Sequence, residues 1–232
     1  MLALLHTSPV HVPVFDALRD AAHPGLELRH HVHAALLERA RQEGPVAVTD
    51  AVGDVLRRAV AQGARAVLCT CSTIGAVAEG AAAGAGVPVL RVDRPMAAAA
   101  VAAGPRVVVL AALRSTLTPT AALVEEEARR AGRPLLLRTR LVEGAWDRFE
   151  AGDTEGYLRL VAEAAEAVTA DDADVIVLAQ ASMAPAREAA RTPVPVLASP
   201  ALGLAAGAAA ARLGHLDPAG SCRGVSAEAG VG

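Results

Sequence analysis

Two stretches of the chain share one pattern, Ala66-Val-Leu-Cys-Thr-Cys-Ser-Thr-Ile-Gly75 and Val175-Ile-Val-Leu-Ala-Gln-Ala-Ser-Met-Ala184. Each starts with the apolar run of a buried strand, continues through small and polar residues, and leads into a segment of helical period. After a similar interval each is followed by the same four residues, Val87-Pro-Val-Leu90 and Val194-Pro-Val-Leu197. A strand–turn–helix–strand unit that occurs twice predicts two similar halves whose strand carboxyl ends meet at a shared cleft.

The rest of the chain has the same alternation of short Val/Leu-rich runs and longer Ala-rich segments. Continuous apolar runs are typical of strands in parallel sheets that helices cover on both faces, so the fold class is α/β. We expect strands at Leu2–Leu5, Leu26–His30, Ala66–Thr70, Val87–Val92, Arg106–Leu110, Leu135–Arg138, Val175–Ala179 and Val194–Ala198. We expect helices at Val14–Ala22, Ala34–Gln42, Val46–Gln62, Ile74–Ala83, Thr120–Ala131, Thr154–Ala170 and Ala201–Leu213.

Helix-capping residues mark the ends of predicted helices, and the repeat indicates two lobes. Asp153 is a predicted helix N-cap, and Gly63 and Gly132 stand where helix C-caps are expected. We predict a first α/β lobe from residues 1–95 plus 199–220 and a second from residues 96–198. Residues 221–232 are rich in Gly, Ala and Ser, which predicts a frayed tail.

Composition excludes several classes of protein. The 232 residues are 53% hydrophobic with a net charge of -3, which predicts a large buried core and disfavours nucleic acid as a partner. The sequence contains no lysine, which excludes a Schiff-base lysine and a P-loop. No apolar run reaches the roughly 20 residues of a membrane helix, so we expect no membrane association. Three cysteines, an odd and sparse count, predict a reducing cytoplasm.

Polar residues follow the strands at the edge where α/β sheets bind ligands. Hydroxyls and helix N-terminal N–H groups at such an edge are suited to binding a carboxylate. The repeat makes Cys71 equivalent to Gln180 and Thr73 equivalent to Ser182. The candidate substrate-binding residues are Thr7, Ser8, Ser72, Thr73, Thr116, Thr118, Gln180, Ala181 and Ser182.

Cys71 is the candidate catalytic residue. It stands between a predicted strand and the following helix, where backbone N–H groups favour a thiolate. A thiolate facing a bound carboxylate would act as a base toward the adjacent carbon, or as a nucleophile. Most free cysteines are small buried fillers, and Cys69, two residues earlier, fits that description.

Histidines and aromatic residues offer further candidates. His6 follows the first strand directly and His33 follows the second, so both are candidates for a second acid or base. The cluster of His30, His31 and His33 raises the alternative of a zinc site, but no ligand motif of finger spacing accompanies it. We therefore expect no metal. Trp146-Asp-Arg-Phe149 reads as a short amphipathic cap that packs on the core.

From Cys71-Ser72-Thr73 outward the sequence resembles the aspartate/glutamate/hydantoin racemase superfamily, which also includes arylmalonate decarboxylases and maleate isomerases. The resemblance covers His6-Thr-Ser8 through Val194-Pro-Val-Leu197. It implies a two-lobed enzyme without a cofactor, in which two cysteines flank the α-carbon of a small carboxylic acid. It also implies a homodimer. Cys71 matches the first cysteine, and Ser72 and Thr73 match the carboxylate-binding turn.

Gln180 departs from this family pattern because it stands where the second cysteine belongs. An amide does not exchange protons near neutral pH, so Gln180 is no second acid or base. The first hypothesis is a racemase or isomerase of a small acid, amino-acid or hydantoin-like, with Cys71 as base and His6, His33 or a Gln180-held water opposite. The second is a single-cysteine lyase, an arylmalonate-type decarboxylase or a dehydratase. The third is a non-catalytic protein that binds a small molecule.

Overall fold

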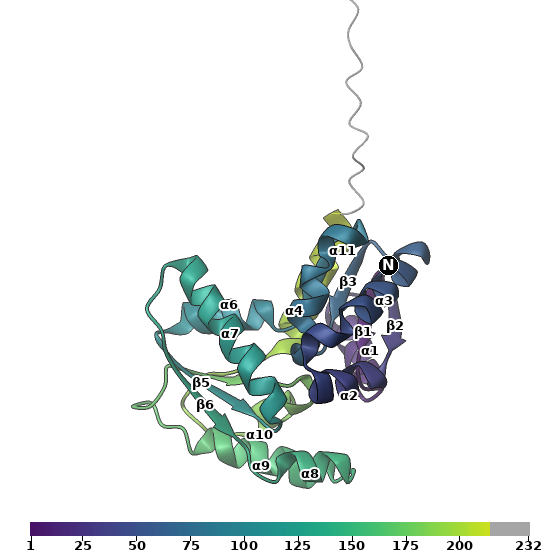
Figure 1. The fold of residues 1–232 in the computed structure, drawn as a ribbon. Coiled ribbons are helices and arrows are strands. Elements are labelled where there is room, and N and C mark those ends of the chain that lie inside the picture. Colours follow the sequence, from purple (N-terminus) through teal and green to yellow (C-terminus); the bar gives the residue numbers. More distant parts are fainter. Residues whose placement is uncertain (214–232) are drawn as a thin grey trace, which may run out of the picture.

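The computed structural model describes residues 1–213, which form two four-stranded parallel sheets flanked by helices (Figure 1). The first sheet has the order β2-β1-β3-β4 and the second the order β6-β5-β7-β8, so the two sheets have the same topology. This confirms the predicted α/β class. The strands are β1 Leu2–His6, β2 Leu28–Val32, β3 Ala66–Cys69, β4 Val89–Arg91, β5 Arg106–Ala111, β6 Leu136–Leu141, β7 Val175–Leu178 and β8 Val196–Ala198.

The sequence repeat corresponds to a structural repeat. Val67 of β3 pairs with Val89 of β4, and the equivalent Ile176 of β7 pairs with Val196 of β8. Parallel strands joined through a helix need a crossover, and both halves make it at the same register. The repeated segments therefore place their turns, after β3 and after β7, at the same position in each sheet.

The helices connect the strands and cover the sheets. The longer helices are α1 His11–Ala22, α2 Ala34–Glu43, α3 Thr49–Ala61, α4 Ser72–Gly80, α6 Arg94–Ala103, α7 Arg114–Ala131, α9 Thr154–Glu166 and α11 Ser199–Leu213. The short ones are η1 Pro45–Val48, α5 Ala82–Ala85, α8 Ala145–Glu150, η2 Ala181–Met183 and α10 Ala186–Ala189. Asp153 caps α9 by accepting a hydrogen bond from Gly156 N (2.9 Å), as predicted.

The largest differences from the expected helix ranges concern α1, α7 and α6, and prolines explain the first two. α1 begins at His11 rather than Val14, and α7 begins at Arg114 rather than Thr120. Pro13 lies in the first turn of α1, where its missing N–H would have no intrahelical partner. Pro119 lies inside α7, which continues past it. α6, which joins the two sheets, was not among the expected helices because its Ala-rich sequence lacks a clear polar face.

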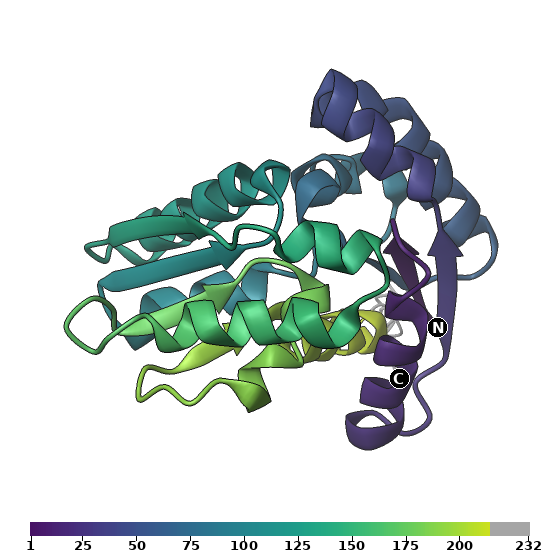
Figure 2. The same ribbon diagram turned by 90° about the horizontal axis from the view of Figure 1, so that it is seen from below.

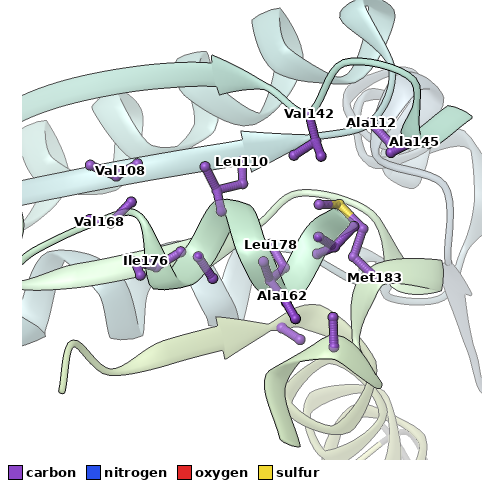
Figure 3. Packing of buried hydrophobic residues seen from close by; sticks show 14 of the residues in the cluster. Val108, Leu110, Ala112, Val142, Ala145, Ala162, Val168, Ile176, Leu178 and Met183 are labelled. Atoms are coloured by element: carbon purple, nitrogen blue, oxygen red, sulfur yellow. The ribbon is translucent and has the colours of Figure 1, made fainter. Parts of the chain in front are cut away.

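Each lobe has its own core. In the second lobe, Leu110, Ile176 and Leu178 pack beneath α9 (Figure 3). In the first lobe, α11 returns from the end of β8 and packs on β3 (Figures 1 and 2, yellow). A Cβ placed at Gly207 of α11 would lie 3.0 Å from the Leu2 side chain, so the helix and sheet are in close contact.

The predicted lobe ranges remain predictions of the sequence. Their last part, residues 214–220, and the tail 221–232 lie outside the described residues. Within residues 1–213 no helix is long and apolar enough to cross a membrane.

Candidate active site

A cavity lies between the lobes, at the carboxyl ends of the central strands. Both lobes contribute to its walls, as the repeat predicts for a cleft shared by two halves. The lining residues are Thr7, Ser8, His11, Leu37, Thr70, Cys71, Ser72 and Thr73 of the first lobe and Leu113, Thr116, Trp146, Phe149, Gln180, Ala181 and Ser182 of the second.

Cys71 is half-buried in the wall of this cavity and is the N-cap residue of α4. Cys69 lies behind it, fully buried, and its thiol donates a hydrogen bond to the Cys71 carbonyl (3.6 Å). Burial raises the pKa of Cys69, so this thiol stays protonated. Of the two described cysteines, only Cys71 lines the cavity.

Ser72 and Thr73 follow in the first turn of α4, and both line the cavity. The Ser72 hydroxyl donates to the carbonyl of Ala179 in the second lobe (3.0 Å), so it bridges the two lobes. Thr73 is buried and makes no side-chain hydrogen bond within residues 1–213. Its hydroxyl is therefore available to a ligand, whereas the Ser72 hydroxyl has already donated its proton.

Gln180 occupies the equivalent place in the second lobe, and its side chain has a structural role there. Its Oε1 accepts hydrogen bonds from the backbone N–H of Ala112 (2.6 Å) and Leu113 (3.2 Å) at the start of α7. Because both partners are donors, the amide orientation is fixed and Nε2 is left as the free donor group. Gln180 thus braces α7 and keeps N–H donors for the cavity.

Ser182 and the aromatic residues complete the second-lobe wall. The Ser182 hydroxyl is 2.8 Å from the Tyr157 hydroxyl, which holds it in place. The rings of Trp146 and Phe149 stack with centroids 4.9 Å apart. Both rings pack on the core as the sequence predicts, but they also line the cavity, which the sequence analysis did not foresee.

Three candidate residues do not line the cavity. Thr118 is exposed on α7: it is two residues beyond Thr116, and two residues turn a helix by about 200°. His33 is the N-cap of α2 and lies away from the cavity. His6 is completely buried behind Thr70. Within residues 1–213 no three His, Cys, Asp or Glu side chains are grouped to hold a metal ion.

His11 is a further cavity residue that the sequence analysis missed. It is the first residue of α1, three positions before the predicted start of that helix. Burial lowers the pKa of His11 to about 4, so its ring is neutral at physiological pH. Its Nδ1 is buried and has no hydrogen-bond partner within the described chain. If the sequence analysis had started this helix two residues before Pro13, it would have placed His11 close to the His6–Ser8 turn.

The fold and cavity define a class of protein: two-lobed, pseudo-symmetric α/β proteins with a thiol and hydroxyls at the site between the lobes. The family model for Asp/Glu/Hydantoin racemase matches residues 11–207, so the chain belongs to that family. No curated protein sequence matches the chain.

Solved structures have the same fold. Glutamate racemase from Bacillus anthracis has a TM-score of 0.69 at 16% identity, covering 89% of this chain and 79% of its own. Allantoin racemase from Klebsiella pneumoniae has a TM-score of 0.64 at 18% identity, covering 92% and 88%. Arylmalonate decarboxylase has a TM-score of 0.58 at 23% identity, covering 90% and 91%. These structures have the fold of the chain in common, and the family match identifies the chain as an enzyme of the Asp/Glu racemase superfamily.

Proposed function

We propose that the protein is a cofactor-independent racemase or isomerase of a small carboxylic acid, amino-acid or hydantoin-like, with Cys71 as the base. The observation that carries the proposal is the position of Cys71: a thiol at a helix N-terminus, open to a small cavity, among hydroxyl groups. Cys69, whose thiol is sealed in the core, has no such access.

The carboxylate of the substrate would be held by neutral donors. The hydroxyls of Thr7, Thr73 and Thr116 line the cavity, and Nε2 of Gln180 is a free donor. Among the described lining residues there is no Arg or Lys, so the negative charge is stabilised by hydrogen bonds and by the N-terminus of α4. Ser8 and Ser182 add hydroxyls at the edges of the same cavity.

In the proposed reaction the Cys71 thiolate removes the proton from the carbon next to the carboxylate. The electron pair moves onto the carboxylate oxygens as a planar enediolate, and the surrounding donors stabilise that charge. Return of a proton to the other face inverts the centre. A water held by Gln180 Nε2 is the proposed donor on that side, since the amide itself has no proton to give near neutral pH. The hydroxide left behind takes a proton from solvent and the Cys71 thiol gives one up, which restores both groups.

A specific observation favours a second candidate, a single-cysteine lyase. Gln180 is held by Ala112 and Leu113, and no second thiol lines the cavity in the described chain. A decarboxylase needs one acid only: loss of CO2 leaves the enediolate, and Cys71 protonates it. The same donors would stabilise the same intermediate.

Proton NMR in D2O tests both candidates with a panel of small α-substituted and malonate-type acids. Wild type is compared with Cys71→Ser, and Cys69→Ala is the matched control. Solvent deuterium in the α-position of recovered substrate, lost in Cys71→Ser and kept in Cys69→Ala, supports the racemase. Product without exchange into substrate supports the lyase. Binding without turnover in all three proteins overturns both and leaves a binding protein.

A further inference from the structure

A chain of hydrogen-bonded side chains runs from the cavity to the surface of the first lobe. Thr70 lines the cavity next to Cys71, and its Oγ1 is 2.8 Å from His6 Nδ1. His6 Nε2 is 2.8 Å from His30 Nδ1. His30 Nε2 is 3.4 Å from Asp16 Oδ1, and Asp16 also pairs with Arg19 at 3.2 Å. Four side chains from β1, β2, α1 and the end of β3 thus form one continuous chain.

The two ends of this chain are in different surroundings. His6 is completely buried and Thr70 almost so, whereas the Asp16 side chain is 38% exposed. The His6 ring stacks on His30 at 5.1 Å and faces Phe15 and His11, with His31 nearby. Burial, with the charges of these histidines, lowers the pKa of His6 to about 3, so His6 is neutral at physiological pH. A neutral imidazole in this position can pass a proton without keeping it.

The hydrogen bonds of the chain are satisfied in two arrangements that differ by one proton. With His30 neutral, His30 Nε2–H donates to Asp16, His6 Nε2–H donates to His30, and the Thr70 hydroxyl donates to His6 Nδ1. With His30 protonated, its Nδ1–H donates to His6 Nε2 and His6 Nδ1–H donates to Thr70.

The Leu5 carbonyl is the remaining hydrogen-bond acceptor at the Thr70 end of the hydrogen-bonded chain. In the protonated arrangement the Thr70 hydroxyl donates to the Leu5 carbonyl (3.2 Å). In the neutral arrangement that carbonyl still accepts from the Thr70 backbone N–H (2.9 Å). No buried polar group loses its partner in either arrangement, so the switch between them avoids the usual cost of an unsatisfied buried group.

We propose that Thr70, His6, His30 and Asp16 form a proton relay that connects the active-site cavity with solvent. The proposal rests on the proposed function, because the Cys71 thiol must lose the proton that it takes from the substrate before it can act as a base again. The relay gives this proton a route to solvent, since Thr70 directly precedes Cys71 in the sequence and lines the same cavity.

One proton charge crosses the relay by four linked transfers. A proton from the cavity joins Thr70 Oγ1 as the Thr70 hydroxyl proton moves to His6 Nδ1. The Nε2 proton of His6 moves to His30 Nδ1, which makes His30 an imidazolium beside the Asp16 carboxylate. His30 then releases its Nε2 proton to water beside Asp16. Rotation of the Thr70 hydroxyl and return of both imidazoles to their Nε2–H tautomers restore the first arrangement. The cavity loses one positive charge and solvent gains it, so the charge balances.

Imidazole 1H–15N NMR spectra of the full chain test the relay without any substrate. The expected result is that His6 carries its proton on Nε2 when His30 is neutral and on Nδ1 when His30 is protonated. The near-isosteric variant Thr70→Val is expected to weaken this coupling, whereas Thr70→Ser preserves it. A His6 tautomer that stays the same throughout the titration of His30 overturns the proposal.

Deuterium wash-in tests the relay during turnover, using the acid found in the survey of substrates. Thr70→Val and His30→Gln are expected to slow exchange of substrate-derived hydrogen with solvent by about 100-fold, at the lower end of what a positioned acid–base group contributes. Thr70→Ser restores exchange, and His31→Gln, the neighbour on β2, is the matched control. Unchanged wash-in in Thr70→Val overturns the relay and leaves the proposed reaction standing. The expected tautomers with no turnover of any acid overturn the reaction and leave the hydrogen-bonded chain standing.

Discussion

The turns after β3 and β7 have similar backbone conformations, but their side chains make different contacts. Cys71 and Gln180 are N-cap residues with similar dihedral angles, φ −108° and ψ 115° against φ −116° and ψ 140°. The side chain of Cys71 is open to the cavity, whereas the side-chain oxygen Oε1 of Gln180 accepts hydrogen bonds from the backbone N–H groups of Ala112 and Leu113. The next position also differs: Ser72 reaches across to the second lobe, and its equivalent Ala181 has no hydroxyl.

The comparison shows that the two lobes place the same backbone at the site but provide different chemical groups. The first lobe provides the thiol, the relay and the only histidines of residues 1–213. The second provides neutral donors, the braced amide and the aromatic wall. A pseudo-symmetric fold therefore carries an asymmetric site.

Acidification is expected to destabilise the first lobe before the second, and this is the largest of the predicted effects. His6 and His11 have pKa values lowered to about 3 and about 4, against 6.5 when unfolded, so the unfolded chain binds more protons below pH 6.5. The free energy of unfolding should thus fall from about pH 6.5 down toward pH 4, by about 1.4 kcal/mol per pH unit for each histidine.

Hydrogen exchange at several pH values measures this effect lobe by lobe. The amides of β1 and β3 should lose protection as the pH falls, before those of β5 and β7, which have no histidine nearby. His11→Gln should flatten the pH slope of stability, and His23→Gln is the control. Loss of protection in both lobes at the same pH contradicts the expectation.

Substitution of Gln180 separates its two roles. Gln180→Leu leaves the N–H groups of Ala112 and Leu113 without their acceptor, so the unfolding free energy should fall by about 1–3 kcal/mol. Gln180→Glu keeps an acceptor and so keeps stability, but it sets a negative charge against the substrate carboxylate. Its KM should rise about tenfold or more, because like charges in contact cost several kcal/mol.

Thermal unfolding and steady-state kinetics on the two variants check this prediction. Equal stability of Gln180→Leu and wild type would show that the brace contributes nothing. An unchanged KM in Gln180→Glu would show that the amide does not face the substrate.

Ser72→Ala gives the first turn the residue of its equivalent Ala181 and should have the smallest effect. It removes the bond from Ser72 Oγ to the Ala179 carbonyl, which is worth about 1 kcal/mol. Chemical denaturation measures the change, and Thr73→Ser, in the same turn, is the conservative control. A loss well above that amount would mean that the interlobe bridge holds more than one hydrogen bond.

The sequence was enough to predict the sheets, the repeat and the position of Cys71. Apolar runs and turn residues indicate buried strands and turns from residues that are neighbours in the sequence. It did not predict the brace of Gln180 or the bond from His6 to Thr70, whose partners are 68 and 64 residues apart. Hydrophobic periodicity contains no information about such partners. His11 was missed for a local reason: the expected helix begins at Val14, whereas α1 begins at His11 with Pro13 in its first turn.

The return of α11 to the first sheet has a consequence for the order of folding. Leu2, Leu68 and Val92 are covered by α11, with Leu204 among them in one cluster. The ribosome makes these three residues early and α11 after the whole of β5–β8. The second lobe can therefore close while the first still exposes this apolar face, so nascent chains that stop before α11 are the ones that a chaperone would bind.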